Sequence, residues 1–341
     1  MTALILSALV ALAPVLCFLG LLLYLDSYKL LAPRRLLLVV AGGALLAGVA
    51  YFINAALLDI TGLAFRTYSR HVAPLVEEAL KALIVVGLMR ARRVGFLVDA
   101  AIFGFAVGTG FALVENLVYL QRIPDATLGL WIVRGFGTAV MHGGTTAMLA
   151  VMALSVLERS ADARQVRMAA FVPGLALATA LHWGFNRLGD APQLATLATL
   201  LVVPALLLAV FQRSEKRLAD WLGSGFDADA QMLELINSGQ FSDSPAGQYL
   251  QTLKQGFSGP MMADALCYVR LYTELSLRAK GLLMMRENGF PTAATDAETR
   301  SRLEELHFLE ASIGVTGLRT LQPMLRMQRK DLWQINLLES A

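Results

Sequence analysis

Long uncharged apolar runs restrict this chain to a membrane fold. Residues 3–25 and 36–58 contain no charged side chain, and residues 191–211 form a third run of the same kind. About 20 consecutive apolar residues are needed for a helix to cross the hydrocarbon core of a bilayer. Because no water is available there, the backbone polar groups of these runs must be satisfied within helices.

Four further segments between these runs pass the same length test, although each carries ionisable groups. They are residues 72–90, 98–121, 129–156 and 168–188. The chain is 56% hydrophobic and 16% charged, whereas soluble domains are about one quarter charged. We therefore predict an all-α polytopic membrane protein with about seven transmembrane helices.

The basic residues of the loops predict the orientation of these helices. Alternate loops hold twelve basic residues against four, which under the positive-inside rule predicts an N-terminus outside and a C-terminus inside. A multi-pass protein of a bacterial-type plasma (inner) membrane is expected. The rich loops contain Lys29, Arg34, Arg35, Arg90, Arg92, Arg93, Arg159, Arg164, Arg167, Arg213, Lys216 and Arg217, and the poor loops contain Arg66, Arg70, Arg122 and Arg187.

Residue 212 is the predicted end of the transmembrane domain. Charge, Gly, Ser and Asp return in residues 213–341, which indicates a separate, helical cytoplasmic region. Regulation, substrate docking or formation of a homo-oligomer are open roles for this region. The net charge of +3 is too small to indicate a nucleic-acid surface.

Ionisable groups are concentrated in the middle four predicted spans. Such groups are costly inside a bilayer, so each needs a functional or structural reason. The predicted orientation brings the acids and histidines of these four helices to one layer in the outer half of the bilayer. The groups are Glu77, Glu78, Lys81, Glu115, Arg134, His142 and His182.

Helical spacing predicts which of these groups share a face. Glu77 and Lys81 are four residues apart, so they can pair on one side of their helix. Gly104 and Gly108 should let a neighbouring helix approach closely beside the acid of the same span. Three sets share a face at helical spacing: Gly104, Gly108, Phe111 and Glu115; Arg134, Thr138, His142 and Thr146; His182 and Asn186.

Carboxylates and imidazoles together suit hydrolysis of a peptide bond. A carboxylate in a dry site is a candidate general base for water, and imidazoles can donate to an oxyanion or ligate a metal with carboxylates. Lys81 and Arg134 would offset the negative charge. Taken singly, the same residues also suit a structural ion pair, a packed histidine, or a His182–Asn186 contact that joins two helices.

The motifs around these residues resemble those of the PrsW family of intramembrane proteases. Glu77 to Lys81 matches its Glu-Glu-x-x-Lys motif, and the stretch DAAIFGFAVGTGFALVEN, which ends at Glu115-Asn116, resembles its second motif. His142 after Arg134, and His182 followed by Asn186, are similar to its later histidine motifs. The four motifs occur in order over residues 70–190.

The resemblance implies a protease that makes the first, extracytoplasmic-side cut in single-span membrane proteins, such as anti-sigma factors. It also implies kinship with type II CAAX prenyl proteases, in which a glutamate activates water. Carried over, Glu77 or Glu78 is the base, with Glu77 preferred and Glu78 as its support, and Glu115, His142 and His182 complete the catalytic site. The supporting residues would be Lys81, Arg134, Asn116, Thr146 and Asn186. If the site holds a metal such as Zn²⁺, the expected ligands are Glu78, Glu115, His142 and His182.

Three other functions compete with the protease. An ion- or proton-coupled transporter also places Glu, Lys and His inside the membrane, but it predicts inverted repeats, and the sequence has none. A CAAX-type peptidase that acts from the cytoplasmic side disagrees with acids in the outer leaflet. A scaffold is disfavoured because buried charges stabilise a membrane bundle poorly.

Overall fold

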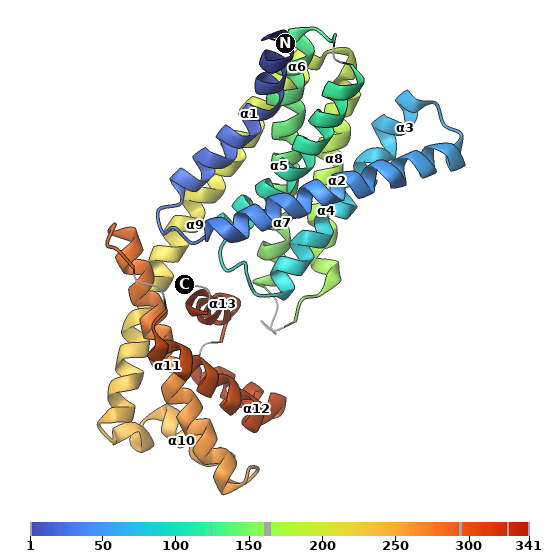
Figure 1. Ribbon diagram of the computed structural model, residues 1–341. Helices are drawn as coiled ribbons and strands as arrows, with labels where there is room; N and C mark the ends of the chain where they lie inside the picture. Colours follow the sequence, from blue (N-terminus) through green and yellow to red (C-terminus); the bar gives the residue numbers. More distant parts are fainter. Residues whose placement is uncertain (1, 124, 160–164, 293–294, 326, 340–341) are drawn as a thin grey trace. The chain divides into compact units, whose positions relative to one another are not determined.

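The computed structural model describes residues 2–123, 125–159, 165–292, 295–325 and 327–339, and every element in these ranges is helical (Figure 1). The chain divides into two compact units, Met1–Glu215 and Lys216–Ala341. The all-α polytopic fold is therefore confirmed. Arg164, one of the basic residues used to predict the orientation, lies outside the described residues.

The first unit contains the candidate membrane spans and several shorter helical elements. Its helices are α1 (Thr2–Leu25), α2 (Pro33–Thr61), α3 (Phe65–His71), α4 (Ala73–Arg90), α5 (Leu97–Arg122), α6 (Leu128–Ile132), the π-helix η1 (Val133–Thr138), α7 (Ala139–Leu157), the 3₁₀-helix η2 (Met168–Phe171), α8 (Val172–Arg187), the 3₁₀-helix η3 (Leu188–Asp190) and the start of α9 (Pro192–Asn237).

Six of the described helical segments are long and apolar enough to span a membrane, which is one fewer than predicted from the sequence. The segment not among them is α4, which carries Glu77, Glu78, Lys81 and Arg90 within 18 residues. A count of seven therefore stays a prediction, as does the orientation. The fifth predicted span is a continuous segment, Leu128–Leu157, that runs through α6, η1 and α7.

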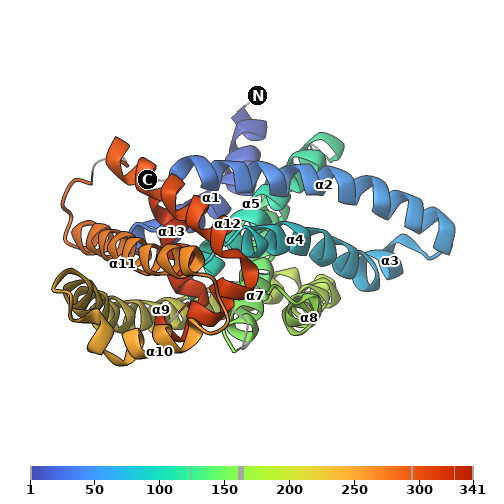
Figure 2. The same cartoon turned by 90° about the horizontal axis from the view of Figure 1, so that it is seen from below.

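Two spans form the buried centre of the first unit. In α5 and in Leu128–Leu157, 89% and 83% of the most apolar stretch is buried, against 22% in α1 and 28% in α2. Figure 1 shows α2 crossing α5 and α7 obliquely, and Figure 2 shows α2 and α4 side by side, joined through α3. The ionisable groups in the middle of these two spans are thus largely surrounded by protein, which reduces the cost of burying them at membrane depth.

Glycines allow α5 to contact the backbone of its neighbours. A Cβ at Gly104 would collide with Thr146 of α7, and one at Gly108 would collide with the carbonyl oxygen of His142. The predicted close approach at these two glycines is therefore confirmed.

At the N-terminus of α5, the Asp99 carboxylate accepts hydrogen bonds from the backbone N–H groups of Gly95 and Phe96, at 2.9 and 3.2 Å.

The second unit has a hydrophobic core of its own. Besides the rest of α9, it consists of the 3₁₀-helix η4 (Gln240–Asp243), α10 (Pro245–Leu253), α11 (Gly259–Glu287), α12 (Ala297–Leu325) and α13 (Arg329–Leu338). Tyr268 and Leu275 of α11 are fully buried in this core. Trp221 Nε1 donates to Asp331 Oδ1 at 2.8 Å, which ties α13 to α9.

We expect Gly108→Ala to lower the thermal stability of the protein, because the added methyl group forces α5 and α7 apart. Overpacking of this kind typically costs about 1–3 kcal/mol. The measurement is the unfolding midpoint of the purified protein in detergent. Gly48→Ala on α2 is the matched control, since a Cβ there meets nothing within 4 Å. Equal midpoints for the two variants would contradict the close approach.

Candidate active site

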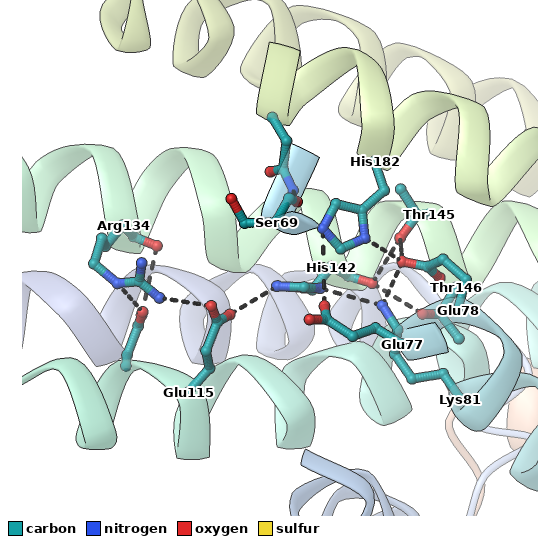
Figure 3. A network of polar contacts seen from close by, with 12 residues as sticks. Ser69, Glu77, Glu78, Lys81, Glu115, Arg134, His142, Thr145, Thr146 and His182 are labelled. Atoms are coloured by element: carbon teal, nitrogen blue, oxygen red, sulfur yellow. Dashed lines mark hydrogen bonds and ion pairs between the residues drawn. The ribbon is translucent and has the colours of Figure 1, made fainter. Parts of the chain in front are cut away.

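Glu78 is the most enclosed acid of the polar cluster. Its side chain is fully buried, and one oxygen, Oε1, lies 2.6 Å from Lys81 Nζ, 2.8 Å from His182 Nδ1 and 3.1 Å from Thr145 Oγ1 (Figure 3). Lys81 therefore pairs with Glu78, three residues away, and the predicted pairing with Glu77 is wrong. A helix places positions i+3 and i+4 on the same side, so spacing alone did not separate the two partners.

Glu77 lies beside this buried pair but has a different environment. Its side chain keeps 15% of its surface exposed. Glu77 Oε1 accepts a hydrogen bond from Asn54 Nδ2 of α2 at 3.2 Å, and Oε2 lies 3.9 Å from His182 Nε2. The second distance is too long for a direct hydrogen bond. Glu77 is therefore more accessible than Glu78 and more weakly held by its neighbours.

His142 joins the acid of α5 to the lysine of α4. His142 Nε2 lies 2.8 Å from Glu115 Oε2, and Nδ1 lies 3.2 Å from Lys81 Nζ. A lysine ammonium only donates hydrogen bonds and a carboxylate only accepts them, so these contacts suit a neutral ring with its proton on Nε2. The rings of His142 and His182 meet edge to face, with centroids 4.8 Å apart.

Arg134 balances the charge of Glu115 from the π-helix η1. Its Nη2 lies 3.1 Å from Glu115 Oε1, and its Nε donates to Asn116 Oδ1 at 2.8 Å. The amide of Asn116 in turn donates to the backbone oxygen of Ala11 on α1 at 2.7 Å. The guanidinium also lies over the ring of Tyr119, 3.6 Å from its centroid. With Glu77, Glu78 and Glu115 ionised and the histidines neutral, the cluster has one negative charge in excess.

Two residues predicted to support the site, Thr146 and Asn186, make their hydrogen bonds to backbone oxygens and not to the acids or histidine rings of the cluster. Thr146 Oγ1 donates to the backbone oxygen of His142 within α7, at 3.0 Å, and Thr145 reaches Glu78 instead. Asn186 Nδ2 donates to the backbone oxygen of Ser69 on α3, at 3.0 Å. Thr145 and Thr146 are adjacent on α7 and therefore point in different directions, and Thr145 is the one that faces Glu78 of α4.

Three residues of one group could hold a metal ion. Ligand atoms of Glu77, His142 and His182 all lie within 4.8 Å of one another. Among the described residues, this is the group whose residue types and spacing suit a metal ion. Two histidines and one glutamate are a donor set that Zn²⁺ uses in catalytic sites. The sequence analysis named Glu78 and Glu115 as metal ligands beside the two histidines. In the structure, these two acids contact the histidine rings.

The contacts of Glu78 and Glu115 are those of carboxylates that orient metal-binding histidines. His182 faces Glu78 with Nδ1, which leaves Nε2 on the side of Glu77. Both ring nitrogens of His142 already have partners, so binding an ion through His142 requires Lys81 or Glu115 to give way. The donor set therefore fits a metal, on that condition.

Sequence reasoning missed Asn54, Tyr68 and Thr145. Tyr68 Oη of α3 donates to Asn54 Oδ1 at 2.9 Å, and Asn54 in turn contacts Glu77. The sequence prediction was based mainly on ionisable groups. Asn54 is an uncharged amide, and the predicted span around it, residues 36–58, contains no charged side chain. An isolated amide in an apolar helix was the available signal, because a buried amide needs a hydrogen-bond partner.

Comparison with known proteins identifies one family. A family model described as PrsW family intramembrane metalloprotease matches residues 32–211, which is more than half of the chain and includes Glu77, Glu78, Glu115, His142 and His182. No curated protein and no solved structure matches the chain.

We expect Lys81→Met to destabilise the protein strongly, because it leaves the carboxylate of Glu78 buried without a cation. Breaking a buried ion pair by removing one partner costs about 3–5 kcal/mol. Adding Glu78→Gln to Lys81→Met should recover part of this loss, since the uncompensated charge is then also removed. Membrane protein level and unfolding midpoint are the measurements, and a double variant that is no more stable than Lys81→Met would contradict the pairing.

Proposed function

Because the chain belongs to the PrsW family of intramembrane metalloproteases, we propose that it hydrolyses a peptide bond near the extracytoplasmic end of single-span membrane proteins. The proposed substrates are of the anti-sigma-factor type, and the proposed location is a bacterial plasma membrane. The support for this side of the membrane is the loop charge pattern, which predicts that Glu77 and Glu78 lie in the outer half of the bilayer.

The observation that carries the proposal is the convergence of Glu77, His142 and His182. These residues come from α4, α7 and α8, and their side chains meet in a part of the bundle that is largely closed to solvent. A partly exposed carboxylate beside two imidazoles can both activate water and stabilise the charge that develops on a peptide carbonyl.

We assign different roles to the two adjacent glutamates. Glu77 takes a proton from the attacking water, since it is accessible and a water molecule could contact both Glu77 Oε2 and His182 Nε2 across their 3.9 Å gap. Glu78 is the anchor that holds Lys81 and His182 in place. Lys81 is the nearby positive charge for the oxyanion. His142 or His182 can donate to the oxyanion only after taking up a second proton, because each neutral ring already directs its single N–H at a carboxylate.

In the metal-dependent alternative, Glu77, His142 and His182 would hold the ion, with Zn²⁺ as the candidate, and Glu77 would act as a ligand instead of as the base. A bound ion would polarise the peptide carbonyl and make water more acidic. Glu78 and Glu115 would then fix the orientation of the histidine rings through the contacts described above, and Arg134 would hold Glu115 in turn.

Cleavage of tagged single-span reporter proteins tests this function. We expect wild-type membranes to yield a fragment whose end maps near the extracytoplasmic end of the reporter helix by mass spectrometry. Glu77→Gln should abolish the fragment at normal membrane levels, because the carboxylate that receives the proton is lost. Glu304→Gln in the second unit, at an exposed position, is the matched control and should leave cleavage unchanged.

A strong zinc chelator separates the two mechanisms within this proposal. Loss of cleavage with chelator and recovery with added Zn²⁺ would support a metal held by the three ligands. Cleavage that persists with chelator would support a glutamate mechanism without an ion. Identical fragments from wild type and Glu77→Gln would contradict the protease assignment of this site and favour the ion- or proton-coupled transporter.

A further inference from the structure

The carboxylate of Glu77 is supported by a hydrogen-bonded chain from outside the charged cluster. Asn54 Nδ2 donates to Glu77 Oε1 at 3.2 Å, and Tyr68 Oη donates to Asn54 Oδ1 at 2.9 Å. The three residues lie on α4, α2 and α3. Tyr68 is 2% exposed, so its hydroxyl group is well shielded from bulk solvent.

The Tyr68 hydroxyl group fixes which end of the Asn54 amide faces Glu77. The amide oxygen only accepts hydrogen bonds and the amide nitrogen only donates them. Because Tyr68 Oη donates to Asn54 Oδ1, the NH₂ group is the end of the amide that faces Glu77 Oε1. Tyr68 therefore acts on Glu77 through Asn54, which fixes the position of one carboxylate oxygen.

Polar contacts to α8 and to η3, which follows it directly, hold α3 in place. Asn186 Nδ2 donates to the backbone oxygen of Ser69, and Arg70 Nη2 lies 2.9 Å from Asp190 Oδ2. Arg66 also pairs with Asp190. Because α8 carries His182, the same helix that provides the imidazole of the site also fixes the position of Tyr68.

We infer that Asn54 and Tyr68 are positioning residues, which orient the Glu77 carboxylate before water is activated. This inference rests on the proposed function of Glu77. A purely structural role for the same contacts would change the amount or stability of the protein but not kcat at equal amounts of folded protein.

Tyr68→Phe and Asn54→Leu test the inference in the full-length protein. Both variants interrupt the chain of hydrogen bonds to Glu77 Oε1 and leave the charged groups of the cluster in place. Membrane level and unfolding midpoint are the first measurement, so that cleavage can be compared at equal amounts of folded protein. Tyr51→Phe is the matched control, since it removes one hydroxyl group from α2 that contacts Arg122 instead, and it should leave cleavage unchanged.

Reporter cleavage provides the second measurement. We expect kcat to fall about tenfold or more in Asn54→Leu with little change in KM, as for other residues that orient a reacting group. Adding Tyr68→Phe to Asn54→Leu should cause no further loss, since the tyrosine acts through the amide.

A kcat equal to that of wild type in Asn54→Leu and Tyr68→Phe, with only the yield or the unfolding midpoint changed, would overturn the inference. Cleavage that survives Glu77→Gln would instead contradict the proposed function.

Discussion

The ion pair between Glu78 and Lys81 is the interaction on which the rest of the site depends. Both side chains are fully buried, and an unpaired charge there would cost several kcal/mol. The same Glu78 oxygen also meets groups from α7 and α8, so three helices converge on one atom. Movement of α7 or α8 away from α4 would remove the hydrogen bond from Thr145 or the contact with His182 and leave Lys81 of α4 as the main partner of this oxygen.

Close packing of α5 against α7 supplies the second constraint. Because Gly104 and Gly108 bring the two backbones together, the side chain of Glu115 can reach His142, and Arg134 can reach Glu115. These groups lie on the helices that are most buried in the protein, while the outer helices present apolar side chains. The charged network is therefore compatible with a membrane because protein groups, rather than lipid, surround it.

Two adjacent glutamates end up in opposite environments because successive residues of a helix point about 100° apart. Glu78 faces α7 and α8 and is saturated at one oxygen, whereas Glu77 faces α2 and keeps part of its surface exposed. One position can thus remain rigid while the other stays available to water. The chain from Tyr68 through Asn54 extends this arrangement to α2 and α3, outside the charged cluster.

The sequence by itself determined the membrane class, the helical segments and the charged and histidine residues of the cluster, because apolar length and buried charge are local properties of the chain. Glu77, Glu78, Glu115, His142 and His182 were all identifiable in this way. Only the tertiary structure decided that Lys81 pairs with Glu78, that Glu77 joins the histidines, and that Asn54 and Thr145 take part. Those choices depend on which side chains of different helices meet, and helical spacing permits several partners until contacts such as those at Gly104 and Gly108 set the register between the helices.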